Sequence, residues 1–380
     1  MTPHFSNRVQ DLHASPIREI LSVIDRPGMI SFAGGLPSVD SFPQFSLEGM
    51  PLETLQYGPS EGEWALREQI AQELATQGLP CQPEQVLMLS GSQQGIDLVA
   101  KLFIDHGTAV AVESPTYLAA LQVFRFFGAR FEPYSAEAVD VQQWRRIKPA
   151  FAYVIPTFQN PTGRCLSGNA RDALASACDA ANVPLFEDDP YRDLVYDDCD
   201  RSPLCARLRH APWIYQGSFS KSLAPGLRLG YLVASPEFLP YLTRLKQAAD
   251  LHSNRMSQWL VLQQLRDPNR HARLLALAHT YRARRDAFDD ALTRHLGALA
   301  SWQKPAGGLF FWLTLNQILD TRLLLAEAID AGVAFMPGEP FMPIETSGVG
   351  QLRLNFSHAS EAQAERGLAV LATLIRKHLA

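Results

Sequence analysis

Cysteine and lysine are both scarce in this 380-residue chain, and the cysteines form no recognisable pattern. The chain has 5 cysteines, and none of them lie in a Cys-x-x-Cys pair. The sequence therefore indicates neither a disulfide framework nor a zinc knuckle, and a reducing cytoplasm is the expected compartment. The 10 histidines do not cluster at ligand spacing, so no metal site is predicted.

Concentrated positive charge and long apolar runs are also missing. The chain carries 34 Lys and Arg against 39 Asp and Glu, with a net charge of −5. Nucleic acid is disfavoured as a partner, because neutralising phosphates requires a concentrated positive face. No signal-peptide pattern opens the chain, and no run approaches the roughly 20 apolar residues of a membrane span. Small molecules are the expected partners.

Short apolar runs bounded by Gly, Pro or Ser recur up to residue 234, and helical patterns lie between several of them. This alternation predicts an α/β domain with a largely parallel sheet. The runs lack polar alternation, as expected for strands that helices cover on both faces. The expected strands are 86–89, 110–112, 152–155, 183–186, 213–215 and 229–234, and the expected helices are 94–103, 118–127 and 171–181.

The pattern changes after residue 234, where longer helical patterns alternate with fewer strand-like runs. We expect helices at 238–247, 270–296 and 363–377, and strands at 309–315, 333–336 and 352–356. We therefore predict a large domain over 46–250 and a smaller α+β domain over 251–380. Residues 1–45, rich in Gly and Pro, form an N-terminal arm or small-domain segment.

Lys221 is the lysine whose context favours chemistry. It ends the segment 217–221, just past a predicted strand, and ligands of α/β sheets bind beyond the carboxyl ends of strands. A lysine amine forms a Schiff base with a carbonyl group, and the hydroxyls of Ser218 and Ser220 suit a phosphorylated ligand that carries one. A surface charge is the alternative interpretation, as for the other five lysines.

Two other segments place polar groups beside predicted strands. Asp188 follows an apolar run, where its carboxylate either pairs with a cationic ring nitrogen or caps a helix in solvent. Ser92 and Gln93 lie between a strand and a helix, where free backbone amides form either a phosphate site or an ordinary helix start. The pattern is neither a dinucleotide fingerprint nor a P-loop.

Arg353 lies on an apolar strand pattern, where the period of two places it on one face with Asn355. It is either an exposed charge or a bidentate clamp for a substrate carboxylate, a task that Arg performs better than Lys. Arg228, at the start of another strand, is by default an arginine that reaches to solvent. The Asn-Pro-Thr-Gly segment at 160–163 by itself predicts only a turn.

Together these segments resemble the fold-type I pyridoxal-phosphate-dependent aminotransferases of class I/II, over nearly the whole chain. The resemblance rests on the joint occurrence of the 160–163 turn, the Asp-x-Pro-Tyr motif at 188–191, the Ser-x-Ser-Lys motif at 218–221 with an arginine seven residues later, and Arg353. Three further segments are similar to the 2-aminoadipate and kynurenine aminotransferase branch, namely 15–20, 32–37 and 56–62.

The resemblance implies a large domain with a mostly parallel central sheet, pyridoxal 5'-phosphate as cofactor, and a role for each residue. Lys221 would hold the cofactor aldehyde and shuttle the proton of the substrate Cα. Asp188 would keep the pyridine nitrogen protonated. Asn160 and Tyr191 would hydrogen-bond the phenolate oxygen, and Tyr117 would stack on the ring.

The phosphate and the substrate have implied sites as well. The phosphate-binding residues would be Ser92, Gln93, Ser218, Ser220 and Arg228, with Tyr57 reaching in from the second subunit of a homodimer. Arg353 would clamp the α-carboxylate beside Asn160, and Gly35 would let the backbone approach the substrate. Arg18 would read acidic side chains such as glutamate or 2-aminoadipate, unless it is an exposed helix residue.

The implied reaction moves an amino group between an amino acid and a 2-oxo acid such as 2-oxoglutarate, by Schiff-base ping-pong chemistry. The donor classes are 2-aminoadipate, glutamate, aromatic and branched-chain amino acids. Fold does not fix the reaction, so a lyase or decarboxylase on the same fold and a non-catalytic cofactor-binding sensor stay open. Arg255 departs from the small or polar residues usual at its position, either as a second carboxylate reader or as a subunit-interface charge.

Overall fold

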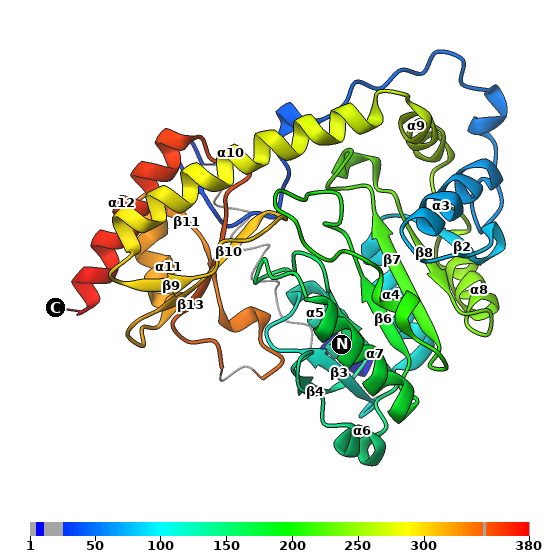
Figure 1. Cartoon of the computed structure of the whole chain (residues 1–380), viewed down its shortest axis with the longest axis horizontal. Coiled ribbons are helices and arrows are strands. Elements are labelled where there is room, and N and C mark those ends of the chain that lie inside the picture. The colour runs from blue at the N-terminus through cyan, green and yellow to red at the C-terminus, as the bar shows by residue number, and fades with distance from the viewer. Residues whose placement is uncertain (1–4, 11–25, 345–346, 380) are drawn as a thin grey trace.

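The computed structural model describes residues 5–10, 26–344 and 347–379. A seven-stranded sheet forms the centre of its larger part (Figure 1). The strand order is β2-β8-β7-β6-β5-β3-β4, and every neighbouring pair is parallel except the two made by β8. The strands are β2 (Val86–Leu89), β3 (Ala109–Glu113), β4 (Arg130–Tyr134), β5 (Ala152–Val154), β6 (Leu185–Asp188), β7 (Trp213–Ser218) and β8 (Gly230–Ala234).

Helices cover both faces of this sheet. Alternate strand residues such as Leu87 and Ile214 pack with one group of helices, and their neighbours Val86 and Tyr215 pack with the other. The first group is α4 (Ser92–Phe103), α5 (Leu118–Phe126) and α8 (Leu239–Asp250). The second group is α3 (Trp64–Thr76), α6 (Val141–Ile147), α7 (Gly168–Ala181) and α9 (Arg255–Arg266). The predicted doubly covered, largely parallel sheet is confirmed.

A smaller antiparallel sheet, β12-β13-β10-β9, lies beside the large one. The long helix α10 (Arg270–Leu296) runs from the vicinity of α9 to the small sheet, where α12 (Glu361–Leu379) packs along it (Figure 1). The remaining elements here are β9 (Ala300–Trp302), β10 (Phe310–Leu315), α11 (Thr321–Asp330), β11 (Val333–Ala334), β12 (Met336–Pro337) and β13 (Gln351–Asn355).

Residues 30–32 of the arm pack on the C-terminal part of the chain. Its strand β1 (Ile30–Ser31) pairs in parallel with β11, and the amide of Asn355 donates to the Phe32 carbonyl at 2.8 Å. The ring of Phe32 contacts that of Phe288 on α10, with centroids 5.3 Å apart. The arm therefore contributes to the smaller core.

Several elements were not expected from the sequence, among them α3, α6, α9, α11, β4 and β9. Strand β4 was not expected, because it lies at the sheet edge with Arg130 and Pro133 exposed and lacks a continuous apolar run. Helix α9 packs against α3 in the core under the large sheet, through Val261 and Leu265. The domain limits at 45 and 250 stay a prediction. Within the described ranges, no helix combines the length and apolarity needed to cross a membrane.

Arg171 fixes the start of the segment that carries Asn160. Its side chain is fully buried, and its Nη2 donates to the Pro156 carbonyl at 2.9 Å and to Thr157 Oγ1 at 3.0 Å. Nη1 donates to the Ser202 carbonyl at 2.9 Å, and Nε donates to the Leu166 carbonyl at 3.1 Å. One guanidinium thus joins α7 to two loops at the end of the sheet.

Replacing Arg171 with leucine should lower the free energy of unfolding by about 3 kcal/mol, because buried carbonyl groups lose their donor. Arg171→Lys should recover only part of the loss, since an ammonium group lacks the planar fork. Urea-unfolding midpoints measure the effect, with the exposed Arg209→Leu as control and an expected change within about 0.5 kcal/mol. Equal midpoints for the two leucine variants would contradict this role for Arg171.

Candidate functional site

The carboxyl ends of the neighbouring strands β5, β6 and β7 bring polar side chains to one edge of the large sheet. Asp188 is the last residue of β6, Ser218 is the last residue of β7, and Asn160 follows β5 in a turn. Lys221 follows three residues after Ser218. The edge beyond parallel strands is where α/β proteins bind ligands, so the candidate site begins here.

Asp188 is a buried carboxylate with both oxygens engaged. Oδ2 accepts a hydrogen bond from Tyr153 Oη at 2.7 Å, and Oδ1 accepts one from Gln216 Nε2 at 2.9 Å. Burial raises the pKa of Asp188 to about 6, against the lowering effect of these two bonds. Sequence analysis missed Tyr153 and Gln216, although a hydroxyl and an amide on buried strands were a signal that each needs a polar partner.

Lys221 directs its amine towards the N-terminal arm. Its Nζ donates to the carbonyl of Gly35 at 2.8 Å and lies 5.9 Å from the centroid of the Tyr191 ring. Burial lowers the pKa of Lys221 to about 8, and the positive charges of Arg353 and Arg228 lower it further. A neutral amine is the nucleophilic form, and this environment makes it accessible near physiological pH.

Arg353, on β13, is buried and faces Asn160. Its Nη1 donates to Asn160 Oδ1 at 2.8 Å, and its Nη2 donates to the Ala33 carbonyl at 2.5 Å. Its guanidinium carbon lies 4.2 Å from the Phe310 ring centroid and 5.0 Å from that of Phe341. Burial lowers the pKa of Arg353 to about 10, so the group keeps its charge at neutral pH. Its Nε has no hydrogen-bond partner among the described residues.

Two tyrosines complete this cluster. Tyr191 Oη accepts a hydrogen bond from Asn160 Nδ2 at 3.4 Å, and burial raises the pKa of Tyr191 well above its ordinary value. Tyr117 lies at the start of α5, and burial raises its pKa to about 12. The charge of Asp188 raises the pKa of both tyrosines, and the charge of Arg353 lowers it. Both phenols are therefore protonated at neutral pH and can donate hydrogen bonds.

A second group of predicted residues gathers at the start of α4. Gly91 has a φ of 81°, and a side chain there would collide with the guanidinium of Arg228. A Cβ at Gly230 would lie 3.0 Å from the backbone nitrogen of Ser92, the first residue of α4. The amide of Ser220 donates to Ser218 Oγ at 3.2 Å. Hydroxyls, helix-start amides and a guanidinium are the groups that could bind an anion here.

The structure bears in different ways on the predictions for Arg18, Tyr57 and Arg255. Arg18 lies outside the described residues. Tyr57 is 76% exposed, with its ring against His252 at 5.8 Å between centroids. Arg255 pairs with Glu63 and donates from Nη1 to the Tyr57 carbonyl at 3.1 Å, so it is engaged within its own chain and holds the segment that carries Tyr57.

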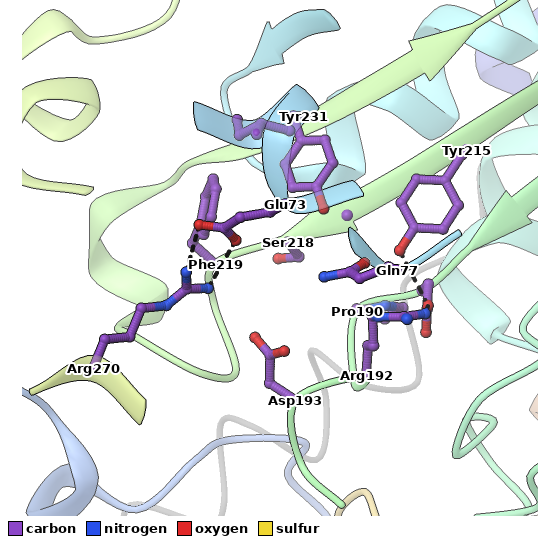
Figure 2. A pocket seen from close by; sticks show the side chains of 13 residues that line it. Glu73, Gln77, Pro190, Arg192, Asp193, Tyr215, Ser218, Phe219, Tyr231 and Arg270 are labelled. Atoms are coloured by element: carbon purple, nitrogen blue, oxygen red, sulfur yellow. Dashed lines mark hydrogen bonds and ion pairs between the residues drawn. The ribbon is translucent and has the colours of Figure 1, made fainter. Parts of the chain in front are cut away.

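A small polar pocket shares Ser218 with this region but has a different character (Figure 2). Both of its arginines are paired, Arg270 with Glu73 and Arg192 with Asp189. Figure 2 shows the Asp193 carboxylate between the two arginines. The cavity measures about 30 Å³, which suits water rather than an amino acid. One of its ion pairs joins α3 to α10, and the other lies within the segment after β6.

Comparisons with known proteins identify the family of this chain. The family model for aminotransferase class I and II matches residues 39–371. The 2-aminoadipate transaminase of Thermus thermophilus is 38% identical over 92% of this chain and 90% of its own length.

Two solved structures are similar over 99% of this chain and 98% of their own. One is the alpha-aminoadipate aminotransferase of Thermus thermophilus in complex with N-(5'-phosphopyridoxyl)-L-leucine, with 34% identity and a TM-score of 0.88. The other is the kynurenine aminotransferase of Pyrococcus horikoshii in complex with PMP, with 32% identity and a TM-score of 0.92. The chain therefore belongs to the class I and II aminotransferases, enzymes of fold type I that depend on pyridoxal 5'-phosphate.

Proposed function

We propose that this enzyme transfers the α-amino group of an amino acid to a 2-oxo acid such as 2-oxoglutarate. The donor is 2-aminoadipate, glutamate, or an aromatic or branched-chain amino acid. One observation carries the proposal: the Lys221 amine, with its pKa lowered to about 8, shares a cluster with the buried guanidinium of Arg353. The names of the relatives, which include an aromatic-amino-acid aminotransferase and a 2-aminoadipate transaminase, support the 2-aminoadipate and aromatic donors.

The described residues fit pyridoxal 5'-phosphate at both of its polar ends. The helix-start amide of Ser92, the hydroxyls of Ser218 and Ser220, and Arg228 would hold the phosphate. The Asp188 carboxylate, fixed by two hydrogen bonds, would hold the protonated ring nitrogen. When bound, the cofactor supplies an aldehyde that captures amines and a conjugated ring that accepts the electron pair released at Cα.

Lys221 would perform two tasks in sequence. Its neutral amine would bind the cofactor aldehyde until the substrate amine replaces it, and the freed amine would then move the proton at the substrate Cα. The Gly35 carbonyl, 2.8 Å from Nζ, orients the amine in the free chain. The lowered pKa of Lys221 suits both tasks, because a permanently charged ammonium could neither attack the aldehyde nor accept a proton.

Arg353 would fix the substrate through its α-carboxylate. The Nε atom without a protein partner is a buried donor that a carboxylate oxygen would satisfy. The two aromatic rings over the guanidinium keep its plane in position, and Asn160 holds Nη1. Clamping the carboxylate decides which bond at Cα is aligned for cleavage.

A homodimer is part of the proposal. Tyr57 is largely exposed on a segment that Arg255 secures, which would let it reach the phosphate of a second copy of the chain. Arg18 would read a distal carboxylate of the substrate, as the resemblance implies. Cytoplasmic localisation stays a prediction.

Absorbance spectroscopy of the purified enzyme with added pyridoxal 5'-phosphate tests the proposed function. Glutamate, 2-aminoadipate, leucine and phenylalanine are titrated in turn, and 2-oxoglutarate is added afterwards. A visible band that bleaches with an amino donor and returns with 2-oxoglutarate would support amino transfer. A band that no amino acid changes, or carbon dioxide or an elimination product without a new amino acid, would contradict it.

The same titration tests Arg18. In an Arg18→Ala variant the KM for glutamate and 2-aminoadipate should rise while that for leucine stays the same. An equal rise in the KM for leucine would show that Arg18 does not recognise acidic side chains.

The rate at which the cofactor-free enzyme takes up pyridoxal 5'-phosphate should depend on pH through Lys221. Because only the neutral amine reacts, the rate should rise about tenfold per pH unit below pH 8 and level off above it. Stopped-flow absorbance at the visible band measures this rate, with Lys221→Ala as the control that gives no band. A rate still climbing tenfold per unit at pH 10 would show that the pKa of Lys221 is not lowered.

Arg353→Lys should lower kcat/KM for every amino acid by about 100-fold, because a single ammonium replaces a bidentate clamp worth about 3 kcal/mol. Affinity for the cofactor should stay unchanged. The control substrates are amines that match each amino acid but lack the carboxylate. Their slow turnover should be the same in the wild-type enzyme and in Arg353→Lys. If the variant lost activity towards these amines by the same factor as towards amino acids, Arg353 would have a structural role.

A further inference from the structure

Two of the five cysteines lie side by side although they are distant in the sequence. Cys165 follows the turn that carries Asn160, and Cys199 lies in the loop after Tyr191. Cys165 Sγ donates to the carbonyl of Asp200, the residue after Cys199, at 3.2 Å. Each thiol is also the largest influence on the pKa of the other, and both residues are partly exposed. The pair is therefore both adjacent and accessible.

Their surroundings give the two sulfurs different roles. The guanidinium Nη2 of Arg171 lies 3.7 Å from Cys165 Sγ, where it favours a thiolate. The Cys199 thiol is the largest influence on Cys165 and lowers its pKa to about 7; burial opposes this shift, and the charge of Arg171 adds to it. The same interaction raises the pKa of Cys199, which keeps its proton. Cys165 is thus the nucleophile of the pair.

The other three cysteines lack these features. Cys178 and Cys205 are buried in the core under the large sheet, and burial raises the pKa of each thiol. Cys81 is partly exposed, but burial still raises its pKa to about 11. Exposure without a lowered pKa makes Cys81 a matched comparison for reactivity.

We propose that Cys165 and Cys199 are a site of reversible oxidation, at which a low-molecular-weight disulfide such as oxidised glutathione converts the two thiols into one disulfide. The Cys165 thiolate attacks one sulfur of the external disulfide, breaks its S–S bond and releases one thiolate. Cys199 then loses its proton to solvent, and its sulfur attacks Cys165 and displaces the second thiolate. Two protein thiols are oxidised and one external disulfide is reduced to two thiols.

The new bond would tie together two segments that flank the catalytic cluster. On one side, a Cβ at Gly163 would lie 2.5 Å from the Phe310 carbonyl, so the Asn160 turn packs tightly on β10. On the other, the amides of Tyr196 and Asp197 donate to the Ala306 carbonyl at 2.8 and 3.0 Å. Both cysteine-bearing segments therefore contact the chain that leads into β10. Oxidation would join them covalently beside the site.

Mass spectrometry of the holoenzyme after incubation with oxidised glutathione tests the proposal. Digestion without reduction should yield a peptide pair joined through Cys165 and Cys199, and the free thiols should fall from five to three per chain and return with dithiothreitol. The midpoint of thermal unfolding should rise by several degrees in the oxidised form, because a cross-link restricts the unfolded chain.

Single variants separate the two roles. Cys199→Ser should stop at a mixed disulfide between Cys165 and glutathione, whereas Cys165→Ser should leave Cys199 at least tenfold slower to react. Cys81→Ser is the control and should oxidise like the wild type. Mixed disulfides on both cysteines without a cross-link, or reaction at Cys81 first, would overturn the proposal.

Alkylation of the wild-type holoenzyme by iodoacetamide gives a test that needs no variant. The alkylation rate at Cys165 should be half-maximal near pH 7, whereas the rate at Cys81 should reach half its maximum only at a far higher pH. Equal pH profiles for the two cysteines would also overturn the proposal.

Discussion

The contact between Arg353 and Asn160 is the interaction on which the site depends. Arg353 comes from the small sheet and Asn160 from a turn beyond the large one, and the guanidinium also binds the Ala33 carbonyl of the N-terminal arm. One buried charge thus joins three parts of the chain that are remote in sequence. Because removing one partner of a buried charge is costly, the fold holds this geometry before any ligand arrives.

The electrostatics of the cluster favours the two anions that the proposed reaction requires. Lys221, Arg228 and Arg353 bring positive charge to the cluster, and Asp188 is the buried acid beside them. Burial lowers the pKa values of Lys221 and Arg353, and repulsion by Arg353 and Arg228 lowers that of Lys221 further. A phosphate at the start of α4 and a carboxylate at Arg353 would each relieve this repulsion. The same field that makes Lys221 reactive therefore also favours the two anionic ends that the reaction requires.

Much of this arrangement could be predicted from the sequence because the functional groups follow strands. Asp188, Ser218 and Lys221 stand where apolar runs end, and strand ends converge in a parallel sheet. The partners of Asp188 could not be assigned, since nothing local says that Tyr153 and Gln216 point to the same carboxylate. Strand β4 escaped prediction because edge strands need not be apolar. Likewise, the pairing of Cys165 with Cys199 depends on how two loops fold together, which no local pattern encodes.

A crystal structure of the enzyme with N-(5'-phosphopyridoxyl)-L-glutamate would test the central claim most directly. The account predicts the phosphate against Ser92 and Arg228, the ring nitrogen within hydrogen-bonding distance of Asp188, and the α-carboxylate on Arg353 with its Nε engaged. An adduct whose carboxylate lies away from Arg353, or whose ring nitrogen faces a group other than Asp188, would contradict the account.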